Sequence, residues 1–248
     1  MPSGGVKMKI SAGTDVGKVR SSNQDSYAIG ELPSGAWAAV CDGMGGHSGG
    51  NVASAMATDV ISDRIRDNVR PSMSVHSVRN MLESAVVTAN ADIFDRSRKE
   101  QELKGMGTTS VVAVCTDHRA TIANVGDSRC YLIRGNTIEQ ITKDHSLVQD
   151  LVDAGVISAE EADSHPMKNI ITRALGLEDD VDVDFYDMSL EAGDKLLLCS
   201  DGLTNHVTED EILCLINSNE TFDYAQKLIN AANERGGTDN ITAVILEN

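Results

Sequence analysis

The amino-acid sequence predicts an α+β fold in which antiparallel sheets pack against helices, and three observations support this. Many short apolar segments are rich in β-branched residues, as strands are. Most of these segments follow one another through short turns, which is typical of antiparallel pairing. Longer segments with apolar residues every three or four positions occur in pairs, so we expect helices that cover the outer faces of the sheets.

The expected strands are the short apolar runs. A hairpin is expected at Arg134-Gly135-Asn136, because glycine and asparagine tolerate the backbone of a tight turn. In chain order, the expected strands are Met8–Thr14, Ala36–Cys41, Thr109–Thr116, Ala120–Val125, Cys130–Arg134, Thr137–Ile141, Val183–Met188, Lys195–Cys199 and Ile241–Leu246.

The expected helices follow the segments with helical spacing of apolar residues. Thr208, with Glu211 three residues later, forms a capping box that opens one helix, and Gly236-Gly237 is a typical helix end. The four main helices are expected at residues 52–69, 78–93, 208–216 and 221–235.

A single domain, residues 1–248, is the simplest organisation, because no stretch rich in proline or serine interrupts the chain as a linker would. Residues 144–176 differ from the rest. They contain two short helical pieces, Leu147–Ala154 and Ser158–Asp163, with weak apolar periodicity. We expect these residues to form a flap subdomain at the periphery, because such segments often gate a site.

The charge balance excludes some partners. Of 248 residues, 38 are Asp or Glu and 21 are Lys or Arg, so the formal net charge is −17. Partners such as nucleic acid or an anionic membrane require clustered cations, and this chain has no such cluster. The five cysteines form no CxxC pair, and no apolar stretch fits a signal peptide or a membrane span. We therefore expect a cytoplasmic protein, and as a separate expectation we take it to be a monomer.

Four aspartates stand at or near strand ends: Asp42, Asp127, Asp201 and Asp239. Any one of them could belong to an ordinary turn. Four carboxylates converging in one cleft would repel one another unless divalent cations neutralised them, and all-oxygen ligands favour Mg²⁺ or Mn²⁺. The pattern therefore predicts a metal centre, and two such ions suit the activation of water for attack on phosphorus.

A phosphate site also needs a positive group, and Arg20 in GKVRSSNQDSY is the candidate. The planar guanidinium group of arginine can bind two phosphate oxygens at once. The alternative is that Arg20 is an ordinary surface residue of a loop.

Seven ordered motifs resemble the PPM family of metal-dependent protein serine/threonine phosphatases, type 2C, and in particular its small bacterial members. The match covers essentially the whole chain. The motifs are VRSSNQDSY, AAVCDGMGGHSGG, GMGTTSVVAV, ANVGDSRCYLI, TKDHSLV, LLLCSDGLT and GGTDNITAV.

The resemblance implies a four-layer α/β/β/α sandwich of two antiparallel sheets flanked by helices, with a metal centre at one edge. It implies that Asp42 bridges two catalytic Mn²⁺ or Mg²⁺ ions and that the carbonyl of Gly43 adds a ligand. Asp201 and Asp239 would bind the second ion, and Asp127 together with Asp201 would hold a third.

The resemblance also implies roles for residues around the metals. Asp25 would act through metal-bound water, and Arg20 would hold the substrate phosphate. Animal members often carry Glu where this chain has Gln24, and they carry a histidine where it has Met44. His47 is then the candidate that protonates the leaving alkoxide or binds substrate. The alternative is that His47 caps a helix beginning near Gly50.

The predicted activity is hydrolysis of phosphoserine and phosphothreonine on proteins by metal-activated water, without a phosphoenzyme. The resemblance implies phosphoprotein substrates and a cognate Ser/Thr kinase in the same cell. Two alternatives remain, namely a catalytically silent domain that binds phosphoproteins and a metal-dependent hydrolase of small phosphate esters. The intact ligand positions disfavour the first, and the absence of a P-loop signature disfavours nucleotide substrates.

Overall fold

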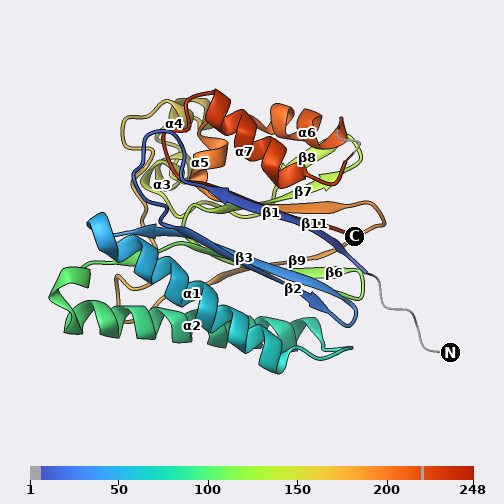
Figure 1. Cartoon of the computed structure of the whole chain (residues 1–248), viewed down its shortest axis with the longest axis horizontal. Helices are drawn as coiled ribbons and strands as arrows, with labels where there is room; N and C mark the ends of the chain where they lie inside the picture. Colours follow the sequence, from blue (N-terminus) through green and yellow to red (C-terminus); the bar gives the residue numbers. More distant parts are fainter. Residues whose placement is uncertain (1–6, 219–220) are drawn as a thin grey trace.

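The computed structural model describes residues 7–218 and 221–248, apart from the side chains of His47, Ser48 and Asp163. The chain forms four layers, with two sheets stacked in the middle and helices on both outer faces (Figure 1). The predicted α+β sandwich is therefore confirmed.

Both sheets are built from antiparallel pairs of strands. The five-stranded sheet has the order β1-β11-β10-β7-β8, and it contains β1 (Lys9–Asp15), β7 (Arg129–Arg134), β8 (Thr137–Gln140), β10 (Lys195–Cys199) and β11 (Ile241–Glu247). The second sheet has the order β2-β3-β5-β6-β9, and β4 also pairs with β3. It contains β2 (Asp25–Leu32), β3 (Gly35–Met44), β4 (Gly107–Thr108), β5 (Ser110–Thr116), β6 (Arg119–Val125) and β9 (Asp184–Ser189).

The helices cover the sheets in two groups (Figure 1). Helices α1 (Gly46–Asn68) and α2 (Val75–Lys99) pack on the second sheet, and a 3₁₀ turn, η1 (Gln101–Leu103), follows them. Helices α6 (Glu209–Asn217) and α7 (Tyr224–Glu234) pack on the five-stranded sheet. The short helices α3 (Leu147–Asp153), α4 (Ala159–Asp163) and α5 (Asp201–Thr204) lie at one end of the sandwich.

Strand β3 shows why both faces of a sheet are buried. Trp37 and Cys41 belong to the apolar layer under α1 and α2, whereas Ala38 and Val40 belong to the layer between the sheets, together with Leu198 of β10. Successive side chains of a strand point to opposite faces. A strand buried on both faces therefore reads as a continuous apolar run, which is why β3 and β10 were predictable.

Local signals place several boundaries as predicted. Strands β7 and β8 form the expected hairpin, with Arg134 paired to Thr137. Thr208 and Glu211 form a complete capping box at α6, as do Ser158 and Glu161 at α4. Four of the five cysteines are buried, and Cys214 is exposed.

Other elements were not predicted. Strand β2 is an edge strand with a half-exposed, mixed sequence, β4 has two residues, and α5 has four. Strand β3 continues past its predicted end to Met44, because Asp42 pairs with Asp25 of β2 and Gly43 pairs with Thr108 of β4. These pairings depend on contacts remote in sequence, so local patterns do not reveal them.

Residues 144–176 contain α3 and α4 and lie at the end of the sandwich near α5 (Figure 1). We call them the 144–176 segment. Their behaviour as a separate flap stays a prediction. Within the described ranges, no helix combines the length and apolar character needed to cross a membrane.

Candidate metal centre and active site

The predicted carboxylates meet at one edge of the sandwich, and Asp42 lies at their electrostatic centre. Burial raises the pKa of Asp42 well above its ordinary value, and the charges of all four other aspartates raise it further. Like charges act in this way only at short range in a partly buried site. The residues concerned are Asp25, Asp201, Asp127 and Asp239.

The backbone around Asp42 is held firmly. The backbone N–H of Asp42 donates to Oγ1 of Thr109 at 2.9 Å, and its carbonyl accepts from the N–H of Thr109 at 2.8 Å and from the hydroxyl of Thr108 at 2.9 Å. A Cβ atom at Gly43 would overlap the carbonyl oxygen of Gly50, so glycine lets the start of α1 approach the strand closely. Asp42 is thus placed by backbone contacts that leave its carboxylate available.

Asp25 lies between the two sheets. Its Oδ2 accepts hydrogen bonds from the hydroxyls of Ser200 and Thr242, each at 2.7 Å, while its buried Oδ1 has no partner. Burial raises the pKa of Asp25 to about 6, although the two hydroxyls act in the opposite direction. One oxygen is therefore anchored to the five-stranded sheet, and the other is free to accept a ligand or a water.

Asp201 is the first residue of α5. Its Oδ2 accepts from Nδ2 of Asn205 at 3.0 Å, and its buried Oδ1 has no partner. Burial and the charge of Asp239 raise the pKa of Asp201. A Cβ atom at Gly202 would overlap the carbonyl oxygen of Asn240, so α5 lies directly against the loop that carries Asp239.

Arg20 lies beside Asp239 at this edge, and its binding of phosphate stays a prediction. Its Nη2 donates to Oδ2 of Asp239 at 2.8 Å, although 219 residues separate the two in sequence. The Arg20 side chain is 52% exposed and that of Asp239 is 32% exposed, so this cation borders the site and still faces solvent.

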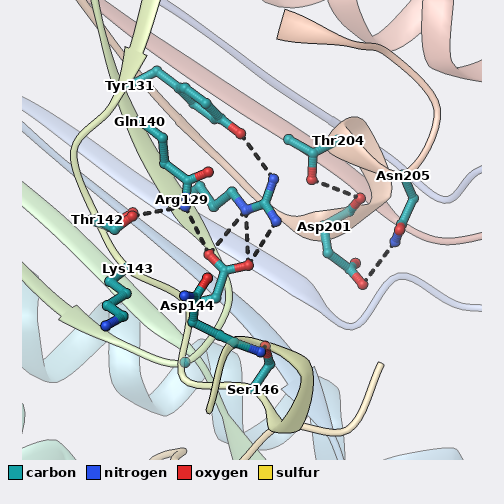
Figure 2. Close-up of polar contacts among 12 residues, drawn as sticks. Arg129, Tyr131, Gln140, Thr142, Lys143, Asp144, Ser146, Asp201, Thr204 and Asn205 are labelled. Carbon is teal, nitrogen blue, oxygen red and sulfur yellow. Dashed lines mark hydrogen bonds and ion pairs between the residues drawn. The ribbon is translucent and has the colours of Figure 1, made fainter. Parts of the chain in front are cut away.

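Asp127 follows β6 and is buried. Burial and the charges of Asp201 and Asp144 raise the pKa of Asp127 to about 8, and the charge of Arg129 opposes this shift. The guanidinium group of Arg129 lies between the phenol of Tyr131 and the carboxylate of Asp144, with Asp201 nearby (Figure 2). Sequence reasoning assigned Arg129 no role, although it belongs to the ANVGDSRCYLI motif.

The donor set fits hard divalent cations. Two buried carboxylate oxygens, Oδ1 of Asp25 and Oδ1 of Asp201, lack hydrogen-bond partners, and neighbouring carboxylates raise one another's pKa. In the part of the chain that the structure describes, no three His, Cys, Asp or Glu side chains are arranged closely enough to hold a metal ion together. The carboxylates therefore share one edge and one electrostatic environment, which divalent cations would neutralise.

The side chain of His47 lies outside the described residues. Helix α1 begins at Gly46, with Gly45 as its N-cap, so the predicted start near Gly50 is wrong and His47 lies within the first turn. The role of His47 in protonation or substrate binding stays a prediction.

Sequence reasoning missed the residues that anchor the site. The hydroxyls of Ser200 and Thr242 fix Asp25, and Asn205 fixes Asp201. The only available signal was their position within or next to the SDGLT and TDNIT runs.

Comparisons with known proteins show the family of this chain. The model of the protein phosphatase 2C family matches residues 12–245. The serine/threonine phosphatase stp of Listeria monocytogenes is 42% identical over 236 residues, which cover 94% of this chain and 93% of that protein.

Two solved structures extend the likeness to the fold. Serine/threonine phosphatase Stp1 from Staphylococcus aureus is 37% identical, with a TM-score of 0.91 and coverage of 98% of this chain and 96% of that chain. The catalytic domain of the phosphatase PstP, solved in complex with two manganese ions, is 35% identical, with a TM-score of 0.84 and 97% coverage of each chain. The chain described here belongs to the protein phosphatase 2C family of serine/threonine phosphatases.

Proposed function

We propose that the edge carrying Asp42 is the catalytic site at which this serine/threonine phosphatase hydrolyses phosphoserine and phosphothreonine on proteins. The observation that carries the proposal is the environment of Asp42, whose pKa is raised by burial and by four other aspartates from separate parts of the chain. So many carboxylates crowded around one buried point are costly for a fold unless they serve cation binding.

Two Mn²⁺ or Mg²⁺ ions would be held by Asp42, Asp201 and Asp239 with the carbonyl of Gly43, and Asp127 with Asp201 would hold a third. The PstP catalytic domain, solved in complex with two manganese ions, supports the binding of a pair of such ions. When bound, such cations neutralise the carboxylates, bind the phosphoryl oxygens and lower the pKa of bound water.

The chain's own groups then position the reactants. The guanidinium group of Arg20, held by Asp239 at 2.8 Å, would bind two oxygens of the phosphate monoester and stabilise charge on them in the transition state. The free Oδ1 of Asp25 would accept a hydrogen bond from water at the site. His47 would donate a proton to the leaving serine or threonine oxygen, or contact the substrate.

The substrates would be phosphoproteins, including those modified by a cognate Ser/Thr kinase of the same cell. The net charge of −17 opposes binding of nucleic acid or an anionic membrane surface. We further propose that the protein acts as a monomer in the cytoplasm.

The direct test measures phosphate release from a phosphothreonine peptide with millimolar Mn²⁺. Wild-type protein should turn the peptide over, and Asp42→Ala or Asp239→Ala should lower kcat/KM by at least about 100-fold, because each removes a cation ligand. The matched control is Asp63→Ala, which removes an exposed aspartate of α1 and should leave the rate unchanged.

Other outcomes would contradict the proposal. Peptide binding without turnover would favour a silent phosphoprotein-binding domain, and turnover of small esters alone would favour a small-ester hydrolase. Undiminished peptide turnover by Asp42→Ala would place the catalytic site elsewhere.

A further inference from the structure

Arg129 and Asp144 form a closely fitted ion pair next to the proposed catalytic edge (Figure 2). Nε of Arg129 donates to both carboxylate oxygens of Asp144 at 3.0 Å, and Nη2 donates to Oδ2 at 2.7 Å. Nη1 donates to the phenol oxygen of the buried Tyr131 at 3.1 Å. Burial disfavours the charged form of Arg129 and so lowers its pKa. Tyr131 and Asp144 outweigh this effect and hold the pKa of Arg129 above its ordinary value.

This pair joins the first residue of the 144–176 segment to β7 of the five-stranded sheet. The next residue, His145, forms two hydrogen bonds with the turn that carries Asp127. The backbone N–H of His145 donates to the carbonyl of Gly126 at 3.0 Å, and the N–H of Gly126 donates to Nδ1 of His145 at 2.9 Å. The start of the segment and the turn before Asp127 are therefore held together.

The far end of the segment is tied to the other sheet. Nη1 of Arg173 donates to Oδ1 of Asp184, the first residue of β9, at 2.9 Å. Nε2 of His145 lies 3.2 Å from Oδ2 of the same aspartate. The start of the segment is thus fixed to both sheets, through Asp144 and His145, and its far end is fixed to the second sheet through Arg173.

The segment forms one wall of a pocket of about 650 Å³. Val148, Gln149 and Val152 of α3 are on that wall, while Asp127 and Asp201 line the pocket as well. The position of the segment therefore sets the width of a pocket that opens directly beside the proposed catalytic carboxylates.

We propose that Arg129 and Asp144 are positioning residues for polypeptide substrates: their ion pair holds the 144–176 segment so that the pocket receives the chain flanking the phosphorylated residue. The inference rests on the proposed function. A small phosphate ester reaches the carboxylates without filling the pocket, so the pair matters for a phosphopeptide and little for a small ester.

A matched control exists at the other end of the same strand. Nε of Arg134 donates to the two oxygens of Asp194 at 3.0 and 3.1 Å, with the same forked geometry. This second pair joins β7 to the turn before β10 and contacts neither the pocket nor the 144–176 segment. If the two ion pairs only stabilised the fold, breaking either pair would change the kinetics with the phosphopeptide in the same way.

The test compares Asp144→Asn with Asp194→Asn, using a phosphothreonine peptide and p-nitrophenyl phosphate. Asp144→Asn should raise KM for the peptide by roughly tenfold and leave kcat for the small ester within about twofold, because one charge-assisted contact is lost outside the reacting centre. Asp194→Asn should change neither. Hydrogen exchange should rise in residues 147–163 of Asp144→Asn and not of Asp194→Asn.

If Asp144→Asn folds poorly, Arg129→Lys with Arg134→Lys as its control gives a second comparison that keeps every charge. Equal losses on both substrates, or the same KM change in the control, would overturn the inference. Kinetics of the wild-type protein distinguish failure of the proposed function from failure of the positioning role. If it fails to hydrolyse the peptide, the proposed function is wrong, whereas an active wild type with no substrate-dependent effect of Asp144→Asn refutes the positioning role alone.

Discussion

At the scale of single residues, the site separates groups that stabilise the fold from groups that serve the reaction. The pair of Arg20 and Asp239 is half exposed, and such pairs contribute about 0–1 kcal/mol to stability. The hydroxyls of Ser200 and Thr242, in contrast, hold a buried oxygen of Asp25. Arg20 is therefore the residue whose loss should affect catalysis with little effect on folding.

Replacing Arg20 by Ala should lower kcat/KM for a phosphothreonine peptide by about 10- to 100-fold, since a charge-assisted hydrogen bond is worth roughly 1.5–3 kcal/mol. The thermal midpoint should hardly move, because the pair is exposed. Arg20→Lys should recover part of the loss, because lysine keeps the positive charge but lacks the planar group that binds two phosphate oxygens at once. Arg64→Ala, at an exposed position of α1, is the control, and full activity of Arg20→Ala would refute the phosphate role.

At the scale of elements, close backbone contacts bring the carboxylates together. Gly43 lies against Gly50 of α1, and Gly202 of α5 lies against Asn240 ahead of β11. A side chain at Gly202 would separate α5, which carries Asp201, from the loop that carries Asp239, and a side chain at Gly43 would push α1 away from the strand that carries Asp42. The glycines of the DGMGG and SDG runs thus set distances between elements.

Replacing Gly202 by Ala should displace α5 from the Asp239 loop. We expect a loss of about 1–3 kcal/mol in the free energy of unfolding, as for other overpacked sites, together with a large loss of peptide hydrolysis. Denaturant titration and steady-state kinetics would measure the two effects.

Gly193→Ala is the contrasting variant. Gly193 has a φ of +88° and open space around its Cβ position, so alanine there should cost stability through backbone strain and leave activity intact. Normal activity of Gly202→Ala would show that this contact does not position the carboxylates.

At the scale of the whole molecule, the excess of acidic residues affects proton binding at one edge of the sandwich. The net charge is −17, and five of the acidic residues meet at one edge. Burial raises the pKa of Asp25 from 3.8 to about 6 and that of Asp127 from 3.8 to about 8. Without cations, the folded state binds protons at this edge more tightly than the unfolded chain does.

Protein stripped of metal by a chelator should therefore lose stability as the pH rises from about 4 to about 8, because ionisation is easier in the unfolded chain. Added Mn²⁺ should raise the thermal midpoint more at about pH 8 than at about pH 5. Thermal denaturation across this range would measure both effects, and Asp127→Asn should flatten the metal-free profile. A metal-free midpoint that rises with pH would contradict this expectation.

The sequence alone predicted the elements whose signals are local. Strands buried on both faces, such as β3 and β10, appear as apolar runs, and capping boxes mark the starts of α4 and α6. Strand β2 was not predicted, because its sequence mixes apolar and polar residues. Its extended conformation depends on pairing with β3.

The sequence by itself determined the α+β class, the phosphatase motifs and the chemistry of the donor set, because these depend on residue type and short-range spacing. The tertiary structure alone decided which groups meet. Arg20 reaches Asp239 because β1 and β11 are neighbours in a sheet although the two residues are 219 positions apart. The 144–176 segment is tied to both sheets for the same reason: the order of strands in space is set by packing over the whole chain, which no local pattern encodes.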